Sequence, residues 1–199
     1  MGKEKHKKKV EELFSKSPVV NLDSIKRIIK DNKDTEYQKQ LIRNLKLHGK
    51  IRRLAKGYYT IHENPELNVF CFQPAYLGLQ DAFSVNNLWE QETIPIIITS
   101  KKIRIGIRRT ELGNILIRRI NRKYIFGYEY KKIGDFYFPY SDVEKTFIDM
   151  LYFRQKIDSK VIKETKKLIN KKKFSDYLKK YPSRFQKRVL KKINDENIF

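Results

Sequence analysis

The hydrophobic pattern of this chain is clearest between Thr35 and Ile61, where it changes from a helical to a strand-like period. The first half places apolar residues on one helix face, at the i, i+4, i+5 and i+8 positions Tyr37, Leu41, Ile42 and Leu45. Gly49 follows, and glycine readily adopts the left-handed conformation that ends helices. The second half predicts a β-hairpin with strands over Lys50 to Leu54 and Tyr58 to Ile61.

Two further helices are predicted before this segment. An otherwise polar stretch from Glu4 to Lys16 carries Val10, Leu13 and Phe14 on one side. A second apolar stripe follows the capping residue Asn21 and consists of Leu22, Ile25, Ile28 and Ile29. Three helices followed by a basic hairpin are typical of a winged helix-turn-helix, which we expect to occupy residues 1–62.

The rest of the chain, residues 63–199, mixes helical and strand-like patterns. A helix is predicted over Ala75 to Val85, and β-branched or aromatic segments predict strands over residues 94–99, 103–109, 114–120, 124–130 and 135–138. The short breaks between these strands favour an antiparallel meander. Ser141 and Glu144 have the spacing of a capping box, and amphipathic helices are predicted over residues 159–170, 174–181 and after Pro182. The expected fold class is α+β, with an N-terminal winged helix-turn-helix, then a mixed α+β domain with a small antiparallel sheet and C-terminal helices.

Charge is distributed unevenly along the chain. The formal net charge is +22, of which residues 1–62 hold +10 (17 Lys and Arg against 7 Asp and Glu). Residues 63–150 hold only +1 (12 against 11), and residues 151–199 hold +11 (16 against 5). A lysine-rich composition bias explains part of this charge but not the neutral centre. Two basic ends around a neutral middle indicate a polyanionic partner.

The remaining composition bounds the cellular setting. Hydrophobic residues make up 40% of the chain, which is enough for a packed core. Cys71 is the single cysteine, so no internal disulfide is possible and a reducing compartment is expected. No apolar run resembles a signal peptide or reaches membrane-spanning length. We therefore expect a cytoplasmic protein with no membrane partner.

Cationic side chains dominate the surface that the N-terminal fold would offer to DNA. The third helix presents Lys39, Gln40, Arg43 and Lys46 away from its apolar stripe, where Arg can pair with guanine and Gln with adenine. The hairpin adds four cations suited to phosphate or minor-groove contacts, Lys50, Arg52, Arg53 and Lys56. Tyr58 and Tyr59 alternate across a strand, so one is expected in the core, and Tyr58 is assigned to the DNA side. The alternative for any such charge run is an ordinary solvated helix face.

Catalytic patterns are weak, and we expect no enzyme, no metal site and no cofactor. The three histidines and one cysteine lack metal-ligand spacing, and the dispersed glycines form no phosphate-binding loop. The alternative is a metal-dependent nuclease in which Glu111 and Glu129 hold Mg²⁺ beside Lys131. Glu129 is more simply explained by an ion pair. Helix capping is predicted for Asp142 and Glu144, and an ion pair for Asp149.

Two assignments remain open in the second half of the chain. Trp89 is predicted as a core aromatic residue, and a partner-facing patch is the alternative. The basic C-terminal helices either extend a DNA footprint, face RNA or an acidic protein, or are simply solvated. An RNA- or protein-binding module acting through these helices is therefore a further alternative for the function.

Several blocks of the sequence resemble the AbiE-type antitoxins, the transcriptional regulators of type IV toxin–antitoxin (abortive infection) systems. The hairpin segment from Gly49 to Tyr59 is similar to the family's N-terminal wing. Later blocks resemble its antitoxin domain in the same order, namely residues 74–83, 88–91, 126–129, 141–145 with Asp149, and 181–183 with Lys187 and Arg188. The strongly basic C-terminal part departs from the family and raises the possibility of a second nucleic-acid contact.

The resemblance implies two domains, a winged-helix DNA-binding domain over residues 1–62 and an α+β antitoxin-like domain over residues 63–199. It also implies a repressor of its own operon that binds double-stranded operator DNA upstream of its gene. The expected second partner is a nucleotidyltransferase-like toxin, which such antitoxins counter without needing a stable complex. We accordingly expect repression by promoter occlusion, with no catalysis.

Overall fold

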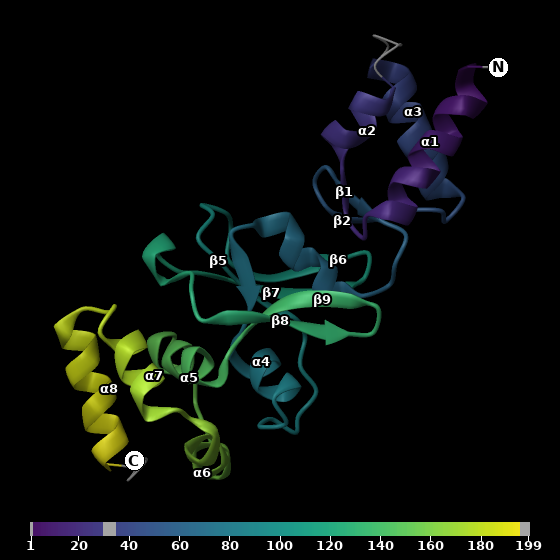
Figure 1. Ribbon diagram of the computed structural model, residues 1–199. Helices are drawn as coiled ribbons and strands as arrows, with labels where there is room; N and C mark the ends of the chain where they lie inside the picture. Colours follow the sequence, from purple (N-terminus) through teal and green to yellow (C-terminus); the bar gives the residue numbers. More distant parts are fainter. Residues whose placement is uncertain (1, 30–34, 196–199) are drawn as a thin grey trace. The chain divides into compact units, whose positions relative to one another are not determined.

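The computed structural model describes residues 2–29 and 35–195 and has a mixed α+β fold (Figure 1). The chain divides into two compact units that do not follow chain order. Unit 1 contains Met1–Cys71 together with Arg108–Ile115, and unit 2 contains Phe72–Ile107 together with Leu116–Phe199. The predicted α+β class is confirmed at this level. Among the described residues, no helix has both the length and the apolar character that a membrane span requires.

Unit 1 contains three helices and a three-stranded antiparallel sheet within the described part of residues 1–60. Their bounds are α1 Gly2–Lys16, β1 Val20–Asn21, α2 Leu22–Ile28, α3 Thr35–Leu47, β2 Arg52–Ala55 and β3 Tyr58–Thr60. The strand order is β1-β3-β2, and Tyr59 of β3 is paired with Val20 on one side and Arg53 on the other. The predicted hairpin is therefore present, although Lys50 lies before its first strand.

The helices of unit 1 form because their apolar stripes meet in one core. The buried residues are Val10, Phe14, Val20, Ile25, Ile29, Leu41, Ile42, Leu45, Ile51 and Tyr59. The predicted cap of α2 is confirmed, since the Asn21 side chain accepts a hydrogen bond of 2.7 Å from the Ser24 backbone N–H. Gly49 ends α3 with φ +66° and donates its N–H to the Lys46 carbonyl, as predicted for a glycine cap.

A six-stranded sheet with the order β6-β7-β5-β4-β9-β8 supplies the strands of unit 2, although residues 108–115 of β6 and β7 are assigned to unit 1. The strands are β4 Ala75–Leu77, β5 Ile96–Thr99, β6 Gly106–Thr110, β7 Gly113–Arg119, β8 Tyr128–Ile133 and β9 Phe136–Ser141. Antiparallel pairs are present as predicted, but β4 runs parallel to β9 and β5 runs parallel to β7. The prediction of an antiparallel meander is therefore wrong. The central strands β4 and β5 are buried throughout, as is usual for strands that are covered on both faces.

Several predicted boundaries are corrected by this sheet. The predicted helix over Ala75 to Val85 begins as strand β4, and the helix α4 is only Leu79–Val85, because Tyr76 and Leu77 are both fully buried. The predicted strand over residues 103–109 starts three residues later. The segment predicted as a strand over 124–130 starts in a 3₁₀ turn, η2 Arg122–Tyr124. A second such helix, η1 Pro65–Phe72, lies where no element was predicted.

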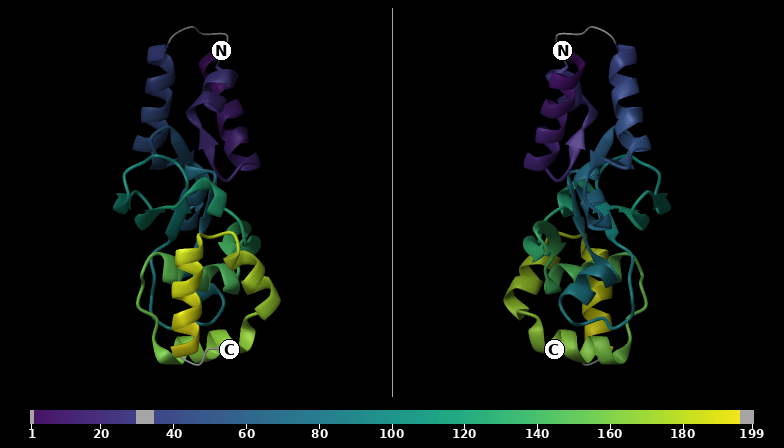
Figure 2. Two further views of the ribbon diagram at one scale, coloured as in Figure 1. Left: turned by 90° about the vertical axis from the view of Figure 1, so that its left-hand side faces the viewer. Right: turned by 90° about the vertical axis from the view of Figure 1, so that its right-hand side faces the viewer.

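The remaining helices of unit 2 pack around α5. They are α5 Val143–Tyr152, α6 Ser159–Leu168, α7 Lys171–Leu178 and α8 Ser183–Asp195. Helix α5 contacts α4, α6, α7, α8 and β9, and Figure 2 shows α8, in yellow, beside the green helices. The cap of α5 is Asp142, whose carboxylate accepts a 2.8 Å hydrogen bond from the Lys145 backbone N–H. The predicted box residue Ser141 instead ends β9.

Candidate nucleic-acid interface

A groove runs along one face of α3 and is lined by cations. Its volume is about 590 Å³, and its lining residues are Leu22, Lys39, Ile42, Arg43, Lys46, Leu47 and Tyr59. Three of the four DNA-binding residues predicted on α3 thus lie together in this groove, whereas Gln40 is exposed outside it. Leu47 is 73% exposed, so the groove also offers an apolar contact. An amphipathic pattern identifies such a helix face but cannot show that the face is hollowed.

The hairpin contributes Tyr59 to the lining of this groove and carries further cations of its own. Arg53 and Lys56 are exposed, and Arg52 is half-buried. Tyr59 is buried in the core and Tyr58 is half-buried, which agrees with the predicted alternation of the two tyrosines. The hairpin therefore presents basic side chains on a strand pair that one buried tyrosine anchors.

Four of the predicted cations already have carboxylate partners on the protein surface. The ion pairs are Lys39–Glu36 at 3.2 Å, Lys46–Glu111 at 2.6 Å, Lys50–Glu11 at 2.7 Å and Arg52–Glu63 at 2.6 Å. All eight side chains are at least one-third exposed. Pairs of this kind contribute roughly 0–1 kcal/mol, so a phosphate group can replace the carboxylate at small cost.

Glu111 makes the most extensive of these contacts. One carboxylate oxygen accepts from the Lys46 ammonium at 2.6 Å and the other accepts from the Arg53 backbone N–H at 2.8 Å. Partial burial opposes ionisation, but hydrogen bonds from Lys46 and Arg53 outweigh it and lower the pKa of Glu111. Glu111 therefore occupies a position where a cation and a backbone donor converge, as they do on phosphate. No sequence pattern signals this contact, because Glu111 is far along the chain from both partners.

The carboxylates proposed for a nuclease have other roles within the described residues. Glu111 is held by Lys46 and Arg53, and Glu129 forms the predicted ion pair, with Lys131 at 3.5 Å. Lys131 also donates to the Asn86 side chain at 2.5 Å. In the part of the chain that the structure describes, no group of three or more His, Cys, Asp or Glu residues is arranged to hold a metal ion.

Unit 2 buries a charged network instead of exposing it. Lys145 and Asp149 form an ion pair with both side chains fully buried, so the predicted ion pair of Asp149 is confirmed. Tyr76 donates its hydroxyl to Asp149 at 2.6 Å, and the Lys145 ammonium donates to the Tyr181 hydroxyl at 3.0 Å. Burial raises the pKa of Asp149 and of Tyr181 and lowers the pKa of Lys145, because a charge in the interior loses its hydration.

The network continues to the neighbouring helices. The Tyr177 hydroxyl donates to Asp142 at 2.9 Å, and partial burial together with this carboxylate raises the pKa of Tyr177 to about 12. Lys173 pairs with both Asp142 and Glu144, at 3.1 and 3.2 Å. Glu144, predicted as a cap, instead accepts the Asn170 backbone N–H at 2.7 Å. These contacts join the N-terminal end of α5 to α7.

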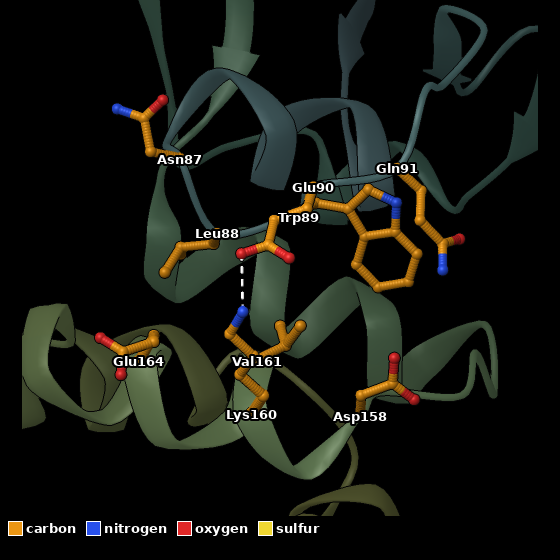
Figure 3. Close-up of a pocket in the computed structure, with 9 residues that line it drawn as sticks. All are labelled: Asn87, Leu88, Trp89, Glu90, Gln91, Asp158, Lys160, Val161 and Glu164. Atoms are coloured by element: carbon orange, nitrogen blue, oxygen red, sulfur yellow. Dashed lines mark hydrogen bonds and ion pairs between the residues drawn. The ribbon is translucent and has the colours of Figure 1, made fainter.

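A separate hollow in unit 2 surrounds Trp89 (Figure 3). Its volume is about 120 Å³, and Lys160 closes one side through a 2.7 Å ion pair with Glu90. Trp89 is partly buried and packs against the core, as predicted, while Figure 3 shows its indole facing the hollow above Asp158. The hollow is small, and its Glu90–Lys160 pair is largely exposed to solvent.

Comparisons with known proteins give no functional assignment for this chain. No family model matches the chain, and no curated protein matches it. The likeness to AbiE-type antitoxins accordingly rests on the sequence blocks alone. The surface that best fits a stated ligand is the cationic groove of α3 with the basic hairpin.

Proposed function

We propose that the chain is a DNA-binding transcriptional autorepressor whose residues 1–62 act as a winged helix-turn-helix. The observation that carries the proposal is the groove on α3, in which Lys39, Arg43 and Lys46 lie together beside a basic hairpin. In this proposal α3 enters the major groove of operator DNA, where Arg43 can donate two hydrogen bonds to a guanine. Arg52, Arg53 and Lys56 contact phosphates or the minor groove, and the half-buried Tyr58 lies at that edge.

The proposed mechanism is occlusion of the promoter. Phosphate contacts set the affinity and its salt dependence, and contacts from α3 to base edges select the operator. The exposed ion pairs of the free protein exchange their carboxylates for phosphates on binding, so little energy is lost with each pair. Nothing in this mechanism requires a metal, a cofactor or a catalytic group.

The antitoxin role is the part of the proposal that rests on the resemblance. An AbiE-type antitoxin would repress an operon that also encodes a nucleotidyltransferase-like toxin and would counter that toxin in the cytoplasm. Unit 2 is the candidate for the second task, because its helices are joined by a buried network that makes a defined surface. Growth rescue by the full chain carrying Arg43→Ala, in cells that express a nucleotidyltransferase-like toxin encoded beside its gene, would test this role separately from DNA binding.

Fluorescence anisotropy tests the DNA-binding proposal. The full chain is titrated into its own upstream DNA and into scrambled DNA across a salt series. Arg43→Ala should lower the preference for upstream DNA about 10- to 100-fold, because one bidentate base contact contributes about 1–3 kcal/mol. Arg52→Ala should weaken both DNAs equally and reduce the salt slope by about one.

Lys9→Ala is the matched control, because Lys9 is an exposed cation on α1, away from the groove. It should change neither the preference nor the slope appreciably. Equal binding to both DNAs, with no effect of Arg43→Ala or Arg52→Ala, would overturn the proposal. The basic surface would then be generic.

A further inference from the structure

Unit 2 contains a cationic hollow that the proposed repressor mechanism does not use. It lies between the C-terminal end of α5 and helix α8, which are in contact, and its volume is about 570 Å³. The lining residues are Leu151, Arg154, Gln155, Lys156, Arg188, Val189 and Lys192. Four of these seven lining residues are cations, and none of the seven is a carboxylate. The volume falls in the range of small-molecule pockets, roughly 300–1,000 Å³.

Arg154 stands in this hollow at a backbone position that favours glycine. Its φ is +54°, in the left-handed region, directly after the end of α5. Its N–H donates to the Leu151 carbonyl at 3.3 Å and the Gln155 N–H donates to the Met150 carbonyl at 2.8 Å, which is the usual hydrogen bonding of a glycine-terminated helix. Arg154 is exposed, so packing in the core does not explain why an arginine occupies this strained backbone position. Such strain commonly marks a residue whose side chain has a function.

The negative end of α5 accounts for only part of this charge. Arg188 donates to the Leu151 carbonyl at 3.5 Å and lies over the Phe185 ring at 5.1 Å, so it acts as a helix cap held in place by an aromatic residue. The dipole effect falls off within the last turn, and one cation satisfies that carbonyl. Arg154 and Lys156 follow the helix and are exposed, so the cap does not explain them.

We propose that this hollow binds phosphate groups, as a second anion site separate from the α3 groove. Several cations converge on one concave surface, and guanidinium groups match the geometry of phosphate oxygens. Leu151 and Val189 are buried, at 8% and 1% exposed, so the polar residues form the part of the lining that a ligand can contact. A nucleoside triphosphate and a nucleic-acid backbone share this chemistry. This proposal gives part of the basic C-terminal region a ligand. The proposal does not depend on the proposed repressor function.

The test uses the full chain carrying Arg43→Ala and Arg52→Ala, so that the α3 groove and the basic hairpin each contribute less to anion binding. Three probes are titrated, namely ATP, a short single-stranded oligonucleotide and a glutamate-rich peptide of matched charge. Arg154→Gly is the decisive variant, because it removes the cation and also relieves the backbone. We expect it to weaken phosphate binding about tenfold with no fall in the melting temperature. Lys156→Ala, in an exposed segment outside any helix, should act in the same direction.

Lys191→Ala is the charge-matched control, since Lys191 is exposed on α8 outside the hollow. It should weaken binding less than twofold. If ATP binds and Arg154→Gly weakens that binding, the ligand is a small molecule. If the oligonucleotide binds and ATP does not, the ligand is a nucleic-acid backbone. The proposal is overturned if neither phosphate probe binds, if the peptide binds equally well, or if Lys191→Ala and Arg154→Gly have equal effects.

Discussion

The two units use the same charged residue types in opposite ways. In unit 1, Lys46 and Glu111 pair on the surface with side chains 34% and 40% exposed. In unit 2, Lys145 and Asp149 pair with neither side chain exposed at all. Water or a phosphate can replace the first carboxylate, but nothing outside the protein reaches the second. The difference teaches that exposure, and not residue type or local charge density, separates cations that can bind a ligand from cations that hold the fold.

The two kinds of ion pair therefore differ in the free energy that is lost when one partner is removed. Breaking an exposed pair costs roughly 0–1 kcal/mol, because both charges regain water. Removing one partner of a buried pair costs roughly 3–5 kcal/mol, because the remaining charge stays buried without compensation. Substitutions at matched pairs can therefore test the comparison directly.

The largest effect is expected for Lys145→Met. The variant keeps most of the side-chain volume but leaves Asp149 buried beside Tyr76 without its cation. We expect a loss of about 3–5 kcal/mol in the free energy of unfolding at neutral pH. Urea denaturation measures it. Lys160→Met removes the lysine of an exposed pair with Glu90 and should leave the free energy of unfolding nearly unchanged.

The same variant predicts a pH dependence with a defined sign. Burial already raises the pKa of Asp149, and loss of Lys145 removes the main opposing influence. A carboxyl whose folded-state pKa is raised loses stability as pH rises from its unfolded value, about 4, through the folded value. The deficit of Lys145→Met should thus be largest at neutral pH and shrink as pH falls toward 4. A deficit independent of pH would mean that lost packing, not charge, causes it.

A smaller loss of stability is expected for Gly127→Ala, whose added methyl group would lie too close to two residues of the buried network. Gly127 has φ +68°, and an added Cβ would lie 2.7 Å from Tyr177 Cε2 and 2.9 Å from Lys145 Cβ. Overpacking of this kind costs about 1–3 kcal/mol, in addition to the backbone strain. Gly134→Ala is the control, because Gly134 has φ +57° but nothing within 4 Å of its added Cβ. Equal losses in thermal unfolding would show that the network tolerates the intrusion.

Local patterns in the sequence predicted the elements whose signals are local. The stripe of Tyr37, Leu41 and Leu45 predicted α3, and Asn21 and Gly49 predicted helix ends that the structure has. Each depends on residues a few positions apart. The cationic face of α3 was predicted for the same reason, although its use for DNA stays a prediction.

Longer-range features could not be predicted in this way. Strand β4 was assigned to a helix because Tyr76 and Leu77 are buried on both sides and show no alternation. The parallel pairs β4–β9 and β5–β7 depend on sheet order, which short breaks between strands do not encode. The position of Glu111 beside Lys46 likewise joins distant segments. The cationic hollow at Arg154 needed the fold to bring α5 and α8 together.

The smallest predicted effect concerns Glu111 and depends on the proposed DNA binding. Glu111→Gln removes the charge that pairs with Lys46 but keeps an oxygen that can accept from the Arg53 N–H. DNA should bind about twofold to fivefold tighter, because a phosphate no longer displaces an ion pair of roughly 0.5–1 kcal/mol. The salt slope should steepen as Lys46 becomes available. Anisotropy measures both quantities.

Glu63→Gln separates this specific contact from a general gain in positive charge. It makes the same charge change beside Arg52, but Glu63 is 77% exposed, and among the described residues its hydrogen bond comes from the Arg52 side chain. If Glu111 holds a position that a phosphate takes in the complex, Glu63→Gln should tighten binding less than Glu111→Gln does. Equal gains from the two variants would mean that only net charge matters. The contact of Glu111 with the Arg53 backbone would then have no part in DNA recognition. Exposed and buried ion pairs would differ only in how well water solvates their charges.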